Sequence, residues 1–394
     1  MLIGSPFLIS LMATLASLPF FLFTLPAGAL ADRVNRQKLV CAINVGLSAT
    51  ALALAMLGWF HLLNPYLILA SAFIIGVGFA FNAPAWTSMV PQIVSDADLL
   101  SAAILSGLQF NVSGIVGPAL GGLLVPLAGA NFVFALNAAC FLLVVLAARK
   151  LKQSTVPETR PMEGFFESFG TIFRYVRSAP RFQVVLVRNF LFALFISVIP
   201  ALMPVVGLNV LRLNASNLGL LFSSMGVGSV IGAVCIIPWL RARLSPDSVA
   251  VAANLLIVVA YGLMAVVRQT EVFFVIAGLG GVGWTLSASE LWVAAQRSMP
   301  SWGRGRMNAA VIMISQGGMA LGGVIWGFAA SIAGTSYTLF GAAILFLMSL
   351  VLAGRLSLNG SGNPEHRISG VLPIHVEPKE VTPTVLARDL LAAE

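Results

Sequence analysis

The chain has 394 residues, of which 59% are apolar and 9% charged, and its formal net charge is +8. An average soluble domain carries about 25% charged residues. So few charges cannot cover a surface that faces only water, which excludes an ordinary soluble protein. The composition predicts a membrane protein, and its long apolar runs favour helices because a membrane barrel would need alternating segments of about 10 residues.

Eleven apolar segments are long enough to cross a bilayer, which takes about 20 helical residues. In chain order they are expected at 5–30, 39–60, 65–89, 100–125, 130–148, 183–207, 216–240, 248–267, 272–295, 307–331 and 335–354. Lys and Arg gather in alternate connections, and connections rich in these residues remain in the cytoplasm. We therefore expect a multi-pass protein of the cell (inner or plasma) membrane, with its N-terminus outside and its C-terminus cytoplasmic. The positive charge follows from this topology, so no nucleic-acid partner is expected.

The sequence repeats itself weakly. GPALGG at 117–122 returns as GMALGG at 318–323, and GVGF at 76–79 returns as GVGW at 281–284, in the same order and at a similar offset. The repeat predicts an all-α membrane protein with two pseudo-symmetric helix bundles.

The expected boundaries are 1–148 for a first bundle of five spans and 183–356 for a second bundle of six. A cytoplasmic linker, 149–182, joins the bundles, and a flexible cytoplasmic tail, 357–394, follows them. The partner of the span at 183–207 would fall before Met1. The first helix of the first bundle is therefore expected to be absent.

The linker is expected to hold an amphipathic helix at the membrane surface. Its apolar residues recur at helical spacing: Met162, Phe165, Phe166, Phe169, Ile172, Phe173 and Val176. Acidic residues lie at its front and Arg174 and Arg177 at its back, which matches the helix dipole.

The stretch GALADRVNRQKLV, residues 28–40, places four charges between two apolar segments. Asp32 ends its own helix, where a negative charge is unfavourable. Compensation is expected from Arg33 or Arg36, or from the N-terminus of the segment 307–331. Such a contact can form in one conformation and break in another, and we call it the latch. The alternative is a surface salt bridge that only marks topology.

Gly28 lies four residues before Asp32 on the same helix face, where it allows another backbone to come close. The whole stretch resembles the signature loop between helices 2 and 3 of the major facilitator superfamily, although Asn35 replaces that signature's common glycine. The matching residues are Gly28, Leu30, Ala31, Asp32, Arg33 and Arg36, with Lys38 near its usual place. In that family the loop gates the cytoplasmic side.

The resemblance implies the major facilitator fold, for which twelve spans are expected. The wider context resembles the enterobactin-exporter-like, or transmembrane secretion effector, branch. The second-half copy of the loop, PWLRARLSPD at 238–247, has Ala242 where Asp32 would fall, so the latch is expected on one side only.

The stretch SGIVGPALGG, residues 113–122, resembles the antiporter motif that exporters of the superfamily carry in their fifth helix. Pro118 cannot donate a backbone hydrogen bond, so a bend is expected there. Gly114, Gly117 and Gly121 share one face, and Gly122 lies on an adjoining strip. The alternative is ordinary packing through small residues.

Charges inside a membrane are costly and often functional. Glu290 is the only acid well inside a predicted span, and it is the first candidate for carrying a coupling proton, with Asp32 as the fallback. Arg188 lies at a similar depth. The alternatives are an interfacial Glu290 paired with Arg297 or Arg188, and an Arg188 that extends to the membrane surface.

Neutral polar residues are candidates for the substrate path: Asn82, Trp86, Gln109, Asn189 and Trp284. Helices 4, 7 and 10 border the central path in the superfamily, and Asn82, Asn189 and Trp284 fall on these. Hydrogen bonds between helices, or an aromatic belt at the membrane surface, would explain the same residues. A path so poor in charge suits an amphipathic substrate.

The predicted function is secondary active transport, namely proton-coupled export of small amphipathic, drug- or siderophore-like molecules by alternating access. A monomer in the lipid bilayer is expected, with a small-molecule substrate, the proton gradient as its energy source and no cofactor or metal. Two alternatives remain. One is a non-transporting or defective membrane binding protein that lacks its first helix; the other is a facilitator or importer of a small neutral solute. An enzyme is not expected, since no Ser/His/Asp set or metal-spaced cluster is present. The absence of a nucleotide-binding loop argues against direct ATP drive.

Overall fold

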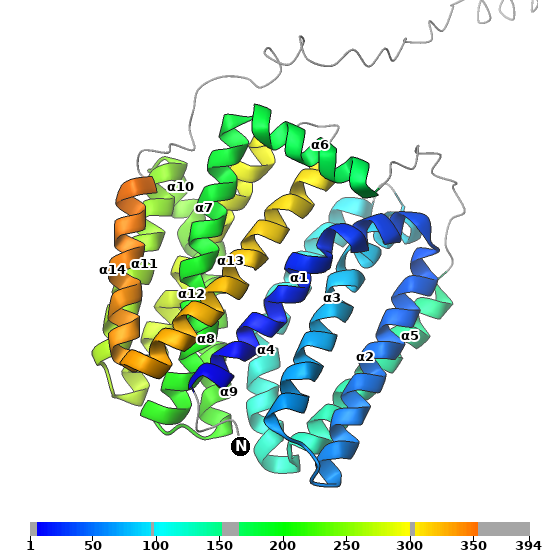
Figure 1. Cartoon of the computed structure of the whole chain (residues 1–394), viewed down its shortest axis with the longest axis horizontal. Coiled ribbons are helices and arrows are strands. Elements are labelled where there is room, and N and C mark those ends of the chain that lie inside the picture. The colour runs from blue at the N-terminus through cyan, green and yellow to red at the C-terminus, as the bar shows by residue number, and fades with distance from the viewer. Residues whose placement is uncertain (1–5, 96–97, 152–164, 300–303, 354–394) are drawn as a thin grey trace, which may run out of the picture. The chain divides into compact units, whose positions relative to one another are not determined.

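The computed structural model describes residues 6–95, 98–151, 165–299 and 304–353, and every regular element in these ranges is a helix (Figure 1). The predicted first bundle corresponds to α1 (Pro6–Arg33), α2 (Arg36–Trp59), α3 (Pro65–Ile93), α4 (Leu99–Ala128) and α5 (Ala130–Lys150). The tail, 357–394, and the front of the linker, 152–164, lie outside the described residues.

The linker helix is α6 (Phe165–Ser178). The predicted second bundle corresponds to α7 (Pro180–Ile196), α8 (Val198–Val205), the π-helical turn η2 (Val206–Val210), α9 (Ala215–Ile231), the π-helical turn η3 (Gly232–Ile236), α10 (Ile237–Arg241), α11 (Pro246–Val266), α12 (Thr270–Ser298), α13 (Arg304–Ala333) and α14 (Thr335–Ala353). Helices thus cover each of the predicted segments. Among the described residues, nine helical stretches are long and apolar enough to cross a membrane, and Thr335–Leu350 is a shorter apolar helix. The division into five and six spans stays a prediction.

Polar side chains define where several helices begin. Asn35 accepts a hydrogen bond from the backbone N–H of Lys38 at 2.9 Å, and Asn64 accepts one from Leu67 at 2.9 Å. Each oxygen satisfies an N–H that has no partner inside its helix. Asn35, which departs from the common glycine of the signature loop, therefore acts as the N-cap of α2.

Two glycines each form a one-residue connection between helices. Gly129 joins α4 to α5 with φ of 84°, and Gly334 joins α13 to α14 with φ of 85°. Glycine adopts this left-handed conformation without the strain that a side chain adds. The two turns lie at corresponding places in the two bundles, as expected for a repeated structure.

The segment predicted at 183–207 is not one continuous helix. It breaks at Ser197 between α7 and α8, three residues before Pro200, which has no N–H for the carbonyl of residue 196. Side chains from other helices bond to the neighbouring carbonyls. Trp326 Nε1 donates to the Leu194 carbonyl and the Tyr261 hydroxyl donates to the Phe195 carbonyl, both at 2.8 Å.

Within each bundle, small and polar residues hold the helices together. Ser48 Oγ of α2 donates to the Ala138 carbonyl of α5 at 2.8 Å. Ser229 Oγ of α9 donates to the Gly281 carbonyl of α12 at 3.1 Å, where Gly281 allows the two backbones to approach closely. Packing through small residues and interhelical hydrogen bonds drives association in lipid, where the hydrophobic effect between helices is absent.

The most extensive contacts between the bundles are those of α1 with α13 and of α4 with α9, and α1 also contacts α8. Helix α1 runs beside α13 and antiparallel to it (Figure 1). Ser10 lies against Gly327, and Phe21 lies against Gly317, where a Cβ would come 2.7 Å from the ring. Residues further along α1 therefore pair with residues correspondingly earlier in α13.

Candidate functional site

The last glycine of each repeated motif lies where the bundles touch. A Cβ on Gly122 of α4 would be 2.9 Å from the Cα of Gly219 in α9, and Ser216 Oγ donates to the Gly122 carbonyl at 2.9 Å. In the other pair, Gly323 of α13 lies directly against Thr14 of α1. The two helix contacts are thus equivalent under the sequence repeat, and small residues permit both.

The antiporter-like stretch contacts its neighbour through Gly122. A Cβ on Gly117 or Gly121 would meet no atom within 4 Å, whereas Gly122 is buried. The close approach falls on the adjoining strip because that strip faces α9. The contacts of Gly114 and Pro118 lie outside the described set, and the backbone of α4 is helical throughout.

Gly122→Val should weaken the contact between α4 and α9, because its side chain would displace the backbone of α9. Overpacking of this kind costs about 1–3 kcal/mol. The matched control is Gly117→Val, which enters open space in the same helix. Thermal unfolding in detergent should show a lower midpoint for Gly122→Val than for the control. Equal midpoints would contradict the described contact.

The loop after α1 is tied to its own bundle. Arg36 Nη1 donates to the Ser88 carbonyl of α3 at 3.2 Å. Gln37 Nε2 donates to the carbonyls of Ala148 and Leu151 at the end of α5, at 2.6 and 3.0 Å. These bonds fix the start of α2 against the ends of α3 and α5.

The predicted close approach at Gly28 is wrong for this structure, since a Cβ there would meet no atom within 4 Å. Asp32 and Arg33 belong to the last turn of α1, and their side chains lie outside the described set. The register between α1 and α13 nevertheless bears on Asp32. If the pairing of Phe21 with Gly317 is continued along the two antiparallel helices, residue 32 lies level with the first turn of α13, which begins at Arg304.

Glu290 forms an ion pair that the sequence did not identify. Its Oε1 accepts a hydrogen bond from Arg241 Nε at 2.7 Å, whereas the alternative interpretation had named Arg297 or Arg188 as its partner. The Glu290 side chain is 1% exposed and that of Arg241 is 42% exposed. A buried carboxylate needs a cation and good geometry to offset its lost hydration. Arg241 supplies both from the last turn of α10.

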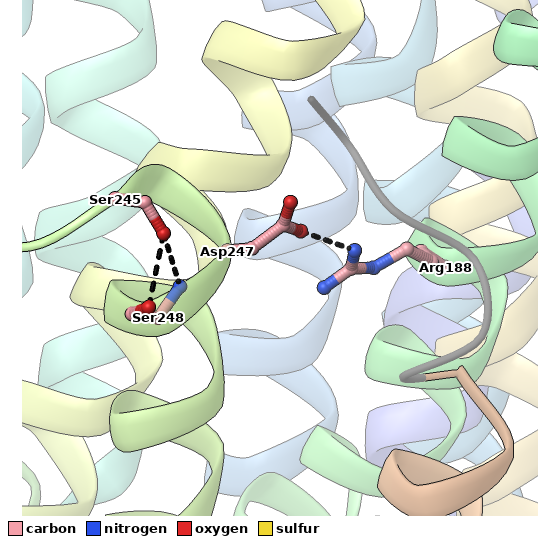
Figure 2. A network of polar contacts seen from close by, with 4 residues as sticks. All are labelled: Arg188, Ser245, Asp247 and Ser248. Carbon is pink, nitrogen blue, oxygen red and sulfur yellow. Dashed lines mark hydrogen bonds and ion pairs between the residues drawn. The ribbon is translucent and has the colours of Figure 1, made fainter. Parts of the chain in front are cut away.

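Arg188 of α7 pairs with Asp247 of α11 at 2.8 Å, rather than with Glu290 (Figure 2). Asp247 lies in the first turn of α11, where the helix dipole favours a negative charge. Ser245 caps the same helix by accepting from the N–H of Ser248 at 3.3 Å. The arginine side chain is 10% exposed, so it is held inside the bundle and does not extend to the membrane surface.

Together the two ion pairs hold the α10–α11 loop, which is the second-half copy of the charged loop after α1. Arg241 anchors the start of this loop to α12, and Asp247 anchors its end to α7. Both partners belong to the second bundle, so these bonds stabilise that bundle and leave the contact between bundles to other groups.

Sequence reasoning missed Asp247 and the role of Arg241. Two signals could have found them. Asp247 follows a serine N-cap and a proline at the start of an apolar segment, which is typical of a helix first turn. Arg241 ends a span on the same side of the membrane as Glu290, where a buried acid requires a nearby base.

The structure assigns packing contacts to two of the substrate-path candidates. Asn82 Oδ1 accepts from Asn44 Nδ2 of α2 at 3.1 Å, and Asn189 Oδ1 accepts from Ser315 Oγ of α13 at 3.4 Å. Trp284 packs against the core of the second bundle.

Trp86 and Gln109 have exposed side chains, on α3 and α4. Whether any of the five candidates borders a substrate path stays a prediction. In the described parts of the chain, no three His, Cys, Asp or Glu side chains gather as a metal site would require.

Known proteins resemble this chain in sequence over all or part of its length, and the first of them covers most of it. The enterobactin exporter EntS of Salmonella typhimurium strain LT2 is 25% identical over 373 residues, which cover 90% of this chain and 86% of the exporter. Macrolide efflux protein A of Streptococcus pyogenes is 28% identical over 134 residues, covering 34% of this chain and 33% of that protein.

Solved structures show the same fold. A bacterial homologue of the human lysosomal transporter Spinster, in an inward-facing and unoccupied conformation, superposes with a TM-score of 0.70 at 15% identity, covering 92% of each chain. The nucleoside transporter NupG gives a TM-score of 0.71 at 10% identity, covering 89% of this chain and 91% of NupG. Residues 2–373 match the sequence family of transmembrane secretion effectors. With two pseudo-symmetric bundles of membrane helices and this match over most of its length, the chain belongs to the transmembrane secretion effector family of major facilitator transporters.

Proposed function

We propose that this transporter exports small amphipathic molecules and is driven by the proton gradient. The observation that carries the proposal is the pair of equivalent contacts between bundles, at Gly122 and Gly323. Two helix pairs joined through small residues allow the bundles to rock against each other, as alternating access requires. Export is supported by two of its relatives, an enterobactin exporter and a macrolide efflux protein.

Glu290 is the proposed proton carrier. Its carboxylate is buried against Arg241, and a proton on the carboxylate would cancel its charge and weaken that ion pair. Loss of the bond releases α10 from α12. The π-helical turn η3 connects α10 to α9, the helix that contacts the first bundle, so the release can reach the interface.

Asp32 is the proposed latch. Support comes from the register, which brings the last turn of α1 level with the first turn of α13. The N-terminus of a helix attracts a carboxylate through its free N–H groups and its dipole. The latch holds the bundles together at the ends of α1 and α13, and it opens when they rock apart.

The proposed setting follows from the charge distribution. Basic connections remain in the cytoplasm. The loop after α1, the linker and the C-terminal tail are therefore assigned to the cytoplasmic side of a bacterial inner membrane. The substrate leaves the cytoplasm, and protons enter in exchange.

Two measurements test this function. An efflux-deficient bacterial host that expresses the full chain should become resistant to some members of a panel of amphipathic compounds. The purified chain in lipid vesicles should then move one of these compounds when a pH gradient is imposed, and an ionophore that collapses the gradient should stop it. Specific binding without movement would instead identify a membrane binding protein, and movement that ignores the gradient would identify a facilitator.

A further inference from the structure

The linker helix α6 has one fully exposed face. Gly170, Phe173, Arg174 and Arg177 are exposed, and their spacing of three, four and seven residues places them on a single side of the helix. The Phe173 side chain is 69% exposed. A large aromatic ring beside two arginines, all open to the surroundings, is typical of a helix that lies at the surface of a membrane.

The opposite face of α6 is fixed to the second bundle. The Tyr175 hydroxyl donates to the Ser298 carbonyl, the last residue of α12, at 2.8 Å. Burial raises the pKa of Tyr175, so this hydroxyl keeps its proton and its donor role at neutral pH. Gln183 Nε2 of α7 donates to the Val176 carbonyl at 2.7 Å, which satisfies the end of α6.

These bonds set the depth of α6 relative to the membrane. Ser298 ends one membrane-spanning helix, and Pro180, two residues after the end of α6, begins another. The helix lies across the ends of α7 and α13 (Figure 1). Its exposed face therefore lies at the level where the spans leave the hydrocarbon, in reach of lipid headgroups.

We propose that this face of α6 binds anionic phospholipid. The guanidinium groups of Arg174 and Arg177 donate to the phosphate oxygens, and Phe173 inserts at the edge of the hydrocarbon. The net negative charge of the lipid is required, because a zwitterionic headgroup offers the two cations no net attraction. Two cations at the membrane surface strengthen the attraction roughly 30-fold. The sequence predicts only that this helix lies at a membrane surface, whereas the structure identifies the face and the lipid class.

The test uses the full chain with its three cysteines replaced by alanine and a nitroxide label at Gly170→Cys, next to the ring. The labelled protein is placed in nanodiscs of phosphatidylcholine, or of phosphatidylcholine with an equal part of phosphatidylglycerol. Three quantities are measured: the mobility of the label, its collision rate with oxygen, which concentrates in lipid, and its collision rate with a nickel chelate, which stays in water. Phosphatidylglycerol should slow the label severalfold and raise its exposure to oxygen.

The double variant Arg174→Gln/Arg177→Gln should remove this response. The control Arg149→Gln/Lys150→Gln, which removes the same charge from the exposed end of α5, should keep it. A label that behaves alike in both lipids, or a response that the double variant retains, would overturn the proposal. A label that is already slowed in phosphatidylcholine alone, and that is freed when residues 361–394 are deleted, would also overturn the proposal. In that case the tail, and not lipid, would cover the face.

Discussion

Asp32→Asn should abolish substrate flux while the protein still inserts and folds. Asparagine keeps the size of the side chain but loses its charge, so the attraction to the N-terminus of α13 is lost. A charge at a partly buried helix end contributes up to about 2 kcal/mol, which corresponds to about a 30-fold shift between closed and open states. Flux into vesicles should fall at least tenfold at equal protein content.

The control for this variant is Asp98→Asn. Asp98 is an exposed acid in the connection before α4, where it accepts a hydrogen bond from Ser95 Oγ at 2.6 Å. The substitution Asp98→Asn removes the same charge from the same proposed side of the membrane, and it leaves the contact of α1 with α13 unchanged. Full flux in Asp32→Asn would remove the latch from the mechanism, and equal loss in both variants would show that only net charge matters.

Glu290→Gln should separate substrate movement from the pH gradient. Glutamine cannot take up or release a proton in this range, and it leaves Arg241 beside a neutral partner. Substrate should still exchange down its own concentration gradient, but an imposed pH gradient should no longer accumulate it. The measurement compares the two kinds of flux in the same vesicles.

Asp247→Asn is the matched control for Glu290→Gln. This substitution breaks the neighbouring ion pair with Arg188. The Asp247 side chain is 26% exposed, and is therefore more exposed than that of Glu290. This variant should be less stable but should still respond to the gradient. If Glu290→Gln keeps its response to the gradient, another group carries the proton.

The positions of the helices were predictable because apolar length alone decides them. The third helix was expected at 65–89 and lies at Pro65–Ile93, and the segment expected at 248–267 is α11, Pro246–Val266. The break at Ser197 was not predicted, although Pro200 gave a signal for it. The hydrophobic pattern of that segment continues across the break, because both sides are buried in the same core.

The partners of the charged residues were not predictable in the same way. Whether Glu290 meets Arg241 or Arg188 depends on how α10, α7 and α12 rotate about their axes, and packing of glycines and side chains fixes those rotations. The same holds for Gly122, which packs against α9 while Gly117 in the same motif does not. The motif identified the helix that packs closely, but only the fold shows which of its glycines makes the contact.

The opening of α1 from α13 tests the central claim most directly. Spin labels at Val34→Cys and Ala309→Cys, in a chain without other cysteines, report the separation between the end of α1 and the start of α13. We expect two populations of distances in the wild-type background and a shift to the longer one when Asp32→Asn is added. A single distance, unchanged by that substitution, would contradict a transporter whose bundles are held at this contact by Asp32.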